Sequence, residues 1–372
     1  MELETLTKKR RRSDDSPAAC PRWVMLSPNI TTRESSNSFP AADAKTTAAS
    51  CTSSGQSFTL SCGLAPPPSS SSFYCQWSGG APGDSKYRPD PEDIGLCVIA
   101  AHDDVVLIQI SLPKRKGNPG LCPLDYHYEY FLYETGAGRP PLLSLLPSSY
   151  ISMQFERKKD VRQDPIPSQR SRSLDSKTTG VLRRGEGKIL VVQLELGYDY
   201  PYNNAAELCV LRCPIRRGRE WVIKRVPIVH HRKEEVEEQQ WWGRRPEVEA
   251  AVPVGNRFMC WVNYHNGFYL CDMAKNKKAP KLRYVELPVL AYDATSGDSR
   301  DFYWPRGSLN LAAAGPDAVR FVAIAPRCCC GGPGKTSCER SSSAFNVTTW
   351  TMSVRTAEAI WVKERVVDCD EL

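Results

Sequence analysis

The chain has 372 residues, of which 41% are hydrophobic and 24% charged, a balance that is ordinary for a globular protein. The formal net charge of +7 is small for this length and does not indicate nucleic-acid binding unless the charge is clustered. No apolar run reaches the ~18 residues that a membrane-spanning helix needs, so no membrane span is expected.

The first 20 residues are predicted to be a disordered basic tail. They contain one tight run of basic residues: Lys8, Lys9, Arg10, Arg11 and Arg12. Such a run is typical of a nuclear localisation signal, and also of a solvated charged tail. The tail has no apolar segment of the kind found in signal peptides, so we expect the protein in the nucleus, the cytoplasm or both. The fifteen cysteines are therefore expected to be mostly free thiols.

The next region, residues 21–30, contains a short apolar segment, Pro21–Leu26, which is predicted to be a strand. Residues 31–85 are rich in Ser, Ala and Pro. This composition buries too little apolar area to offset the entropy of ordering the chain, so the segment is predicted to be disordered. A plastid transit peptide has a similar composition, which leaves the chloroplast as an alternative location.

From residue 86 onward the pattern changes to short β-rich runs separated by Gly, Pro, Asn or Asp, which favours an all-β domain over βαβ units. The predicted strands are Leu96–Ala101, Val105–Leu112, Tyr126–Glu134, Leu142–Leu146, Lys188–Gly197, Glu207–Cys213, Trp221–Pro227, Arg257–Asn263, Gly267–Met273, Lys281–Leu287, Ala318–Ala325, Ala344–Val354 and Ile360–Val367. His102, Asp103 and Asp104 are predicted to form a turn between the first two of them.

A weak internal repeat is visible among these runs. Leu142–Pro147, Trp221–Pro227 and Leu282–Pro288 are each a strand that ends at a proline. Repeats of this kind, roughly 60–80 residues apart with several strands per unit, predict an irregular β-propeller-like domain over residues 86–372. A large two-sheet sandwich would give a similar strand count. Because the sequence ends directly after the predicted strand Ile360–Val367, an incomplete last blade is also expected, with Trp23–Leu26 as the segment able to complete it.

Two insertions, residues 157–188 and 230–251, interrupt the strand pattern and are predicted to be exposed loops. The first carries ten Lys or Arg residues against four acidic ones. It lacks the interleaved aromatic residues that single-stranded nucleic acid binding favours, so a solvated loop is the preferred interpretation.

A resemblance covers the C-terminal third of the chain. It rests on Gly255–Tyr264, His265–Asp272, Tyr284–Pro288, Phe321–Ile324 and Thr348–Met352. These segments resemble the plant, grass-expanded family called domain of unknown function 1618, most strongly over residues 250–372. The resemblance implies a β-propeller-type fold with an F-box-associated or kelch-like pattern. It implies no established activity.

No catalytic, metal or cofactor site is predicted. Gly331–Thr336 lacks the first glycine of a phosphate-binding loop, and no histidine has HExxH spacing. Cys328, Cys329, Cys330 and Cys338 are candidate redox-sensitive thiols, on the hypothesis that Arg327 and Lys335 lower a thiol pKa. A zinc site is less favoured, because three consecutive cysteines on a strand alternate between its two faces.

The absence of a catalytic pattern favours a non-enzymatic protein-interaction module with an unknown protein partner. Two alternatives remain at this point. One is an enzyme whose site is dispersed over several blades. The other is a nuclear regulator that makes weak nucleic-acid contact through the basic loop 157–188.

Overall fold

The computed structural model describes residues 23–33, 45–78, 94–113, 126–136, 139–149, 172–185, 187–196, 205–214, 221–229, 247–264, 266–274, 280–288, 308–326, 344–356 and 358–371. Their regular structure is β throughout, apart from 3-10 turns such as Cys369–Glu371, so the all-β prediction is confirmed. None of the described segments is a helix long and apolar enough to cross a membrane.

The first sheet contains the segment that the sequence predicted to be disordered. Its strands are β1 (Met25–Leu26), β2 (Thr31–Arg33), β3 (Ala48–Cys51), β4 (Ser57–Gly63) and β5 (Ser70–Trp77). Both β1 and β2 pair in parallel with β5. The prediction of disorder is wrong for residues 45–78, because buried side chains alternate with more exposed, mostly polar ones in β4 and β5. Phe58, Leu60 and Cys62 on β4 and Phe73, Cys75 and Trp77 on β5 all enter one buried cluster.

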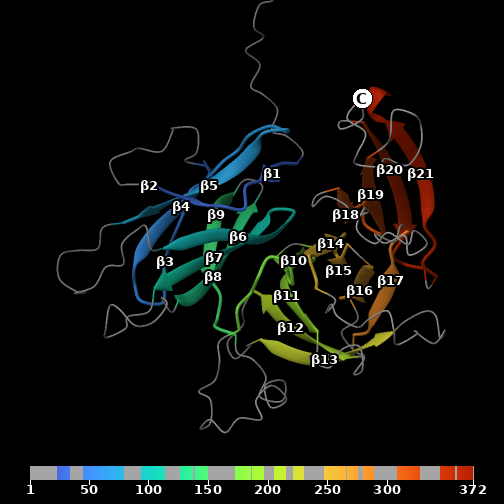
Figure 1. Ribbon diagram of the computed structural model, residues 1–372. Helices are drawn as coiled ribbons and strands as arrows, with labels where there is room; N and C mark the ends of the chain where they lie inside the picture. Colours follow the sequence, from blue (N-terminus) through green and yellow to red (C-terminus); the bar gives the residue numbers. More distant parts are fainter. Residues whose placement is uncertain are drawn as a thin grey trace, which may run out of the picture.

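The rest of the described chain forms four units of four consecutive antiparallel strands, the organisation of propeller blades (Figure 1). We number these units two to five, counting the first sheet as unit one. Unit two has β6 (Gly95–His102), β7 (Val105–Pro113), β8 (Tyr126–Gly136) and β9 (Arg139–Leu145); unit three has β10 (Thr179–Arg183), β11 (Ile189–Leu196), β12 (Ala205–Cys213) and β13 (Val222–Val229). Unit four has β14 (Ala250–Val254), β15 (Phe258–Asn263), β16 (Gly267–Asp272) and β17 (Leu282–Glu286); unit five has β18 (Leu309–Ala313), β19 (Ala318–Pro326), β20 (Phe345–Ser353) and β21 (Val362–Asp368).

Successive units pack face to face around four buried clusters. Units two, three and four each bury both faces, since the alternate side chains of one strand enter different clusters. On β15, for example, Trp261 packs toward unit three, whereas Cys260 and Val262 pack toward unit five. Units three and four are also joined at their outer edges by a short parallel pairing of β13 with β17.

The interface between units three and four depends on a glycine in the short strand β10. A Cβ atom at Gly180 would lie 2.7 Å from the Met259 sulfur atom of unit four. Only glycine therefore lets the two sheets approach this closely without moving the Met259 side chain.

The first sheet is not arranged like the other blades. Tyr133, near the end of β8, donates a hydrogen bond to the carbonyl of Thr46, before β3. Glu129, near the start of β8, accepts one from the amide of Ser53, after β3. Strand β3 therefore runs opposite to β8, whereas the first strand of a regular blade would run the same way as β8. The first sheet therefore faces unit two as in a sandwich. At one edge the two sheets are joined by backbone hydrogen bonds, from the Val98 amide to the Pro28 carbonyl and from the Ile30 amide to the Leu96 carbonyl.

The proline-closed repeat has a structural counterpart, because the predicted runs correspond to β9, β13 and β17, the fourth strands of three units. A tryptophan also recurs just before a fourth strand. Trp221 and Trp361 precede β13 and β21, and their indole nitrogens donate to carbonyls of the preceding unit, at Pro147 and Glu286. The last unit has four strands, so the expected incomplete blade is wrong, and Met25–Leu26 pairs with β5 rather than with that unit.

The two ends of the sheets carry connections of different length. First and second strands are joined by short turns, such as Asp103–Asp104 and Gly255–Arg257. Connections between successive units are long and lie at the other end, where β6, β10, β14 and β18 begin; we call this the entry end. The predicted insertions 157–188 and 230–251 belong to these connections, although β10 and the start of β14 lie within them.

Candidate functional site

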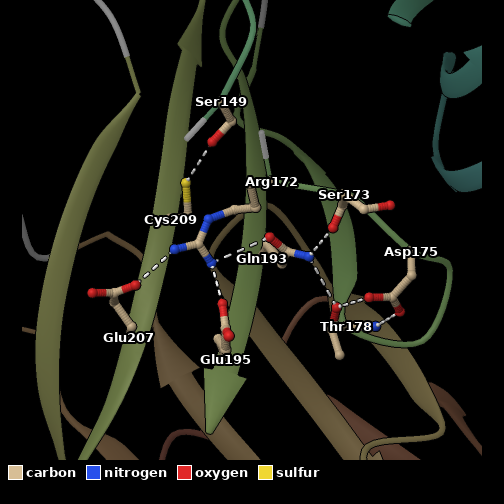
Figure 2. A network of polar contacts seen from close by, with 9 residues as sticks. All are labelled: Ser149, Arg172, Ser173, Asp175, Thr178, Gln193, Glu195, Glu207 and Cys209. Carbon is tan, nitrogen blue, oxygen red and sulfur yellow. Dashed lines mark hydrogen bonds and ion pairs between the residues drawn. The ribbon is translucent and has the colours of Figure 1, made fainter. Parts of the chain in front are cut away.

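A buried arginine at the entry end joins two carboxylates of unit three (Figure 2). Nη2 of Arg172 lies 2.6 Å from Oε2 of Glu207, and Nη1 lies 2.6 Å from Oε2 of Glu195. The side chain of Arg172 is 2% exposed, that of Glu207 7%, and that of Glu195 34%. Arg172 belongs to the basic insertion, so the prediction that the insertion is an exposed loop is wrong for this residue.

The pairing of β11 with β12 explains why a cation is needed here. Glu195 and Glu207 lie directly opposite each other in the register of these strands. Like charges in this relation are destabilising, and the guanidinium between them neutralises most of the repulsion. The neighbouring pair, Gln193 and Cys209, is buried as well.

Neutral side chains next to the ion pairs extend the network (Figure 2). The Gln193 amide nitrogen donates to the carbonyl of Ser173 at 2.8 Å and to the hydroxyl of Thr178 at 3.3 Å. The Cys209 sulfur lies 3.4 Å from the Ser149 hydroxyl, and burial raises the pKa of this thiol. Cys209 is thus a packed, protonated thiol rather than a nucleophile.

A tight turn leads from this network into β10. One carboxylate oxygen of Asp175 accepts the amide hydrogens of Lys177 and Thr178, both at 2.8 Å, and the other accepts the Thr178 hydroxyl. This is the Asx-type pattern in which an aspartate side chain fixes the backbone after it.

The segment Arg172–Thr178, which we call the hub segment, is bonded to three units. The amide of Arg172 donates to the carbonyl of Ser149, which follows the last strand of unit two. The amide of Leu174 donates to the hydroxyl of Tyr130 in β8 of the same unit. The segment's contacts to unit three, drawn in Figure 2, are made with the side chains of Gln193, Glu195 and Glu207. The buried indole of Trp261 in unit four donates to the Thr178 carbonyl at 2.7 Å. The hub segment is therefore a fixed point of the entry end.

Charged side chains project around the hub segment. Lys177 is 59% exposed and lies 4.0 Å from Glu247, which is 77% exposed. Asp175 is exposed too, and Glu195 is partly exposed beside Arg172. We call Asp175, Lys177, Glu195 and Glu247 the entry platform. Three acidic groups and one lysine give it a formal charge of −2.

A second polar cluster lies at the opposite end of units two and three. Arg183 pairs with Asp104 at 3.2 Å and with Glu134 at 3.0 Å. Asp103 and Asp104 form the predicted turn, in which Asp103 has a φ of 52°, whereas His102, also predicted to belong to the turn, is the last residue of β6. The Nδ1 atom of His102 accepts the Arg183 amide hydrogen at 2.9 Å, which requires the neutral ring. Burial lowers the pKa of His102, while Asp103 and Asp104 oppose this shift.

A third cluster joins the first sheet to unit two. The buried Glu129 accepts the amide and the hydroxyl of Ser53, and His127 lies 3.5 Å from the same carboxylate. In a hydrolase the serine would contact the imidazole, which would act as its base. Here the carboxylate stands between Ser53 and His127, so the cluster holds the β3–β4 turn rather than activating a nucleophile.

A group of potential metal ligands lies at the C-terminal end of β21. Asp368, Cys369 and Asp370 place one ligand atom each within 4.8 Å of one another. They are consecutive residues at the end of β21 and are partly or fully exposed, without the convergent, enclosed donors of a structural metal site.

The predicted site residues fall outside the described part of the chain. This holds for the basic run Lys8, Lys9, Arg10, Arg11 and Arg12, and for the candidate redox thiols Cys328, Cys329, Cys330 and Cys338. The nine described cysteines are free thiols, which agrees with the expected redox state. Burial raises the pKa of Cys75 and Cys271 to about 12.

Sequence reasoning missed the hub segment. Its signal was polar residues within otherwise apolar strands, namely Gln193 and Glu195 in β11 and Glu207 in β12. Charged groups in a buried strand need partners, and two cations, Arg172 and Lys177, stand within the seven residues before β10.

Comparison with known proteins finds a family match over the C-terminal third of the chain and no activity. Residues 261–372 match the family model described as a protein of unknown function (DUF1618), which confirms the resemblance over that part of the chain. No curated protein matches the chain. The matched residues run from Trp261, which bonds the hub segment, to the end of unit five.

Proposed function

We propose that the chain is a non-enzymatic protein-interaction module that binds a partner protein at the entry platform. The observation that carries this proposal is the hub segment, where a buried arginine, two carboxylates and bonds to three units fix one short turn. Pre-ordered charged groups on a rigid base lose little entropy on binding, which favours recognition.

The charge of the platform specifies the kind of partner. Glu247 and Asp175 are exposed. Lys177 contacts both: its side chain lies 4.0 Å from Glu247, and its amide donates to Asp175. A partner segment that carries basic and hydrogen-bonding side chains would complement this arrangement, with steering by charge in the encounter.

The two alternative functions have less support. Within the described residues, the polar clusters at Arg172, Arg183 and Glu129 leave no nucleophile beside a free base. Arg172 and Arg183, which counted toward the basic insertion, are already ion-paired with acidic residues of the protein. They are therefore not available to phosphate groups.

Affinity capture with charge-reversed variants tests the proposal. The full chain and its Glu247→Lys and Lys188→Glu variants would be used as bait in an extract of the native tissue, with quantitative mass spectrometry. Lys188 is exposed in the turn between β10 and β11, at the opposite end of the sheet. We expect a protein that is retained by the wild type and Lys188→Glu and is depleted at least about tenfold with Glu247→Lys. Equal retention by all three would contradict the proposal.

A further inference from the structure

The outer face of unit five carries exposed aliphatic side chains. Its inner face packs on unit four through Val319, Phe321 and Met352. Its outer face carries a hollow lined by Ala318, Thr351, Ser353, Ile360, Val362 and Glu364. Ile360 is 63% and Val362 60% exposed. Among the described residues, no buried cluster covers this face.

The exposure of Ile360 follows from the alternation of the chain before β21. Ala359 and Trp361 turn inward and pack on the buried cluster between units four and five. Ile360, between them, turns outward and continues into Val362. The two aliphatic side chains thus form a ridge beside a floor of small residues, Ala318, Thr351 and Ser353.

We infer that this face binds the same face of a second copy of the chain across a two-fold axis. A two-fold interface needs a self-complementary surface, and a ridge beside a hollow provides one, because the ridge of each copy can fill the hollow of the other. The inference concerns a different surface from the entry platform and does not depend on the proposed function.

The charges of the face favour a second copy over an acidic or basic partner. They include two pairs of opposite sign: Arg320 lies 3.1 Å from Glu364, and Arg355 lies 2.5 Å from Asp317. Glu358, which also lines the hollow, adds one acidic group. Such a surface presents both signs to its own copy and attracts no strongly charged macromolecule.

The size of the face is sufficient for a weak dimer. Unit five has four strands, and its longest strands, β19 and β20, have nine residues. The other two strands, β18 and β21, have five and seven residues, so with spacings of ~4.8 Å between strands and ~3.3 Å along them the face covers roughly 480 Å². Two copies would bury on the order of 1,000 Å², about the minimum for a specific interface.

Head-to-tail stacking on the first sheet is disfavoured by the chemistry of that sheet. The side chains of β5 that face away from its core are Ser70, Ser72, Tyr74 and Gln76. A polar face of this kind does not match an aliphatic ridge, so the closed two-fold dimer is preferred to an open chain of copies.

Sedimentation equilibrium of the full chain tests the inference over roughly 1–100 µM, the range in which a modest interface dissociates. We expect a reversible monomer–dimer equilibrium and a dissociation constant at least about tenfold higher for the double variant Ile360→Lys/Val362→Lys. Val222→Lys, at an exposed valine of β13 in unit three, should leave the constant unchanged. Far-UV circular dichroism and thermal unfolding would show that each variant is folded.

Three results would overturn the inference: a monomer throughout the range, a dimer unaffected by the double variant, or association that continues beyond the dimer. These outcomes are separate from the capture experiment, because the Glu247→Lys variant lies on another surface and should dimerise as the wild type does.

Discussion

Arg172 and Glu207 form an ion pair with an N–O distance of 2.6 Å in which both side chains are more than nine-tenths buried. Breaking such a pair from one side leaves a buried charge without its partner. We expect Arg172→Met to lower the free energy of unfolding by about 3–5 kcal/mol, measured by urea denaturation. Lys177→Met, in the same segment but exposed, should change it by less than about 0.5 kcal/mol.

The double variant Arg172→Met/Glu207→Leu separates the ion pair from the loss of packing. Removing both charges eliminates the uncompensated carboxylate, so part of the lost stability should return. If Arg172→Met alone is as stable as the wild type, the hub segment does not fix the entry end, and the basis of the proposed function is lost.

The indole of Trp261 gives a second test of the hub segment. Trp261→Phe keeps most of the apolar volume but removes the indole bond to the Thr178 carbonyl, which keeps the Leu194 amide as its other donor at 3.1 Å. The lost bond and the smaller ring together should cost about 1–2 kcal/mol of stability. Trp361→Phe removes a bond to the Glu286 carbonyl at a more exposed position and should cost about 1 kcal/mol or less. Urea denaturation of both variants measures the difference. Equal effects would mean that the buried bond has no special role.

The His102–Arg183 contact predicts a dependence of stability on pH. Burial lowers the pKa of His102 in the folded protein below its ordinary value of 6.5. The unfolded chain therefore binds more protons as the pH falls below about 6.5, and the folded state loses stability there, by at most about 1.4 kcal/mol per pH unit. The contribution is fully present above pH 6.5 and is lost as the pH falls through the folded-state pKa.

His102→Asn is the matched control, since its side-chain oxygen can accept the Arg183 amide hydrogen without titrating near neutrality. Urea denaturation between about pH 5 and 8 should show a smaller slope for the variant than for the wild type. Identical slopes would assign the pH dependence to other groups.

The thiols should differ in reactivity according to burial. With a pKa of about 12, the Cys75 and Cys271 thiols are ionised at pH 8 only to the order of 10⁻⁴, and they are also inaccessible. Cys51 is exposed on β3. Alkylation of the native protein, followed by mass spectrometry of each peptide, should label Cys51 at least about 100-fold faster than the other two. Comparable rates would show that the sheets open readily.

Most of the strands could be predicted from the sequence, and the exceptions share a cause. β10, β14 and β18 are short, and their Gly180, Pro253 and Ala312–Ala313 give no clear alternation. Each is the first strand of its unit. β10 and β14 are packed by neighbouring units on both faces, so their residues follow the space available in the packing and show no amphipathic pattern. β4 and β5 were missed although their alternation is regular, because serine dominates the composition.

The hub segment could not be assembled from the sequence for a different reason. Arg172 precedes β10, whereas Glu195 and Glu207 end up opposite each other only because β11 and β12 pair in one register. That register is set by the packing of Val191, Leu211 and their neighbours against unit two. The sequence pattern locates the strands but does not specify which cation neutralises the two carboxylates.

Site-specific photo-crosslinking tests the proposed interaction most directly. A photoreactive amino acid would replace Lys177 on the entry platform or, as the control, Lys188 at the opposite end of β10; both are exposed. After irradiation in an extract of the native tissue, we expect one defined covalent adduct with another protein from position 177, absent from position 188 and lost with Glu247→Lys. No adduct at position 177, or the same adducts from both positions, would contradict the account.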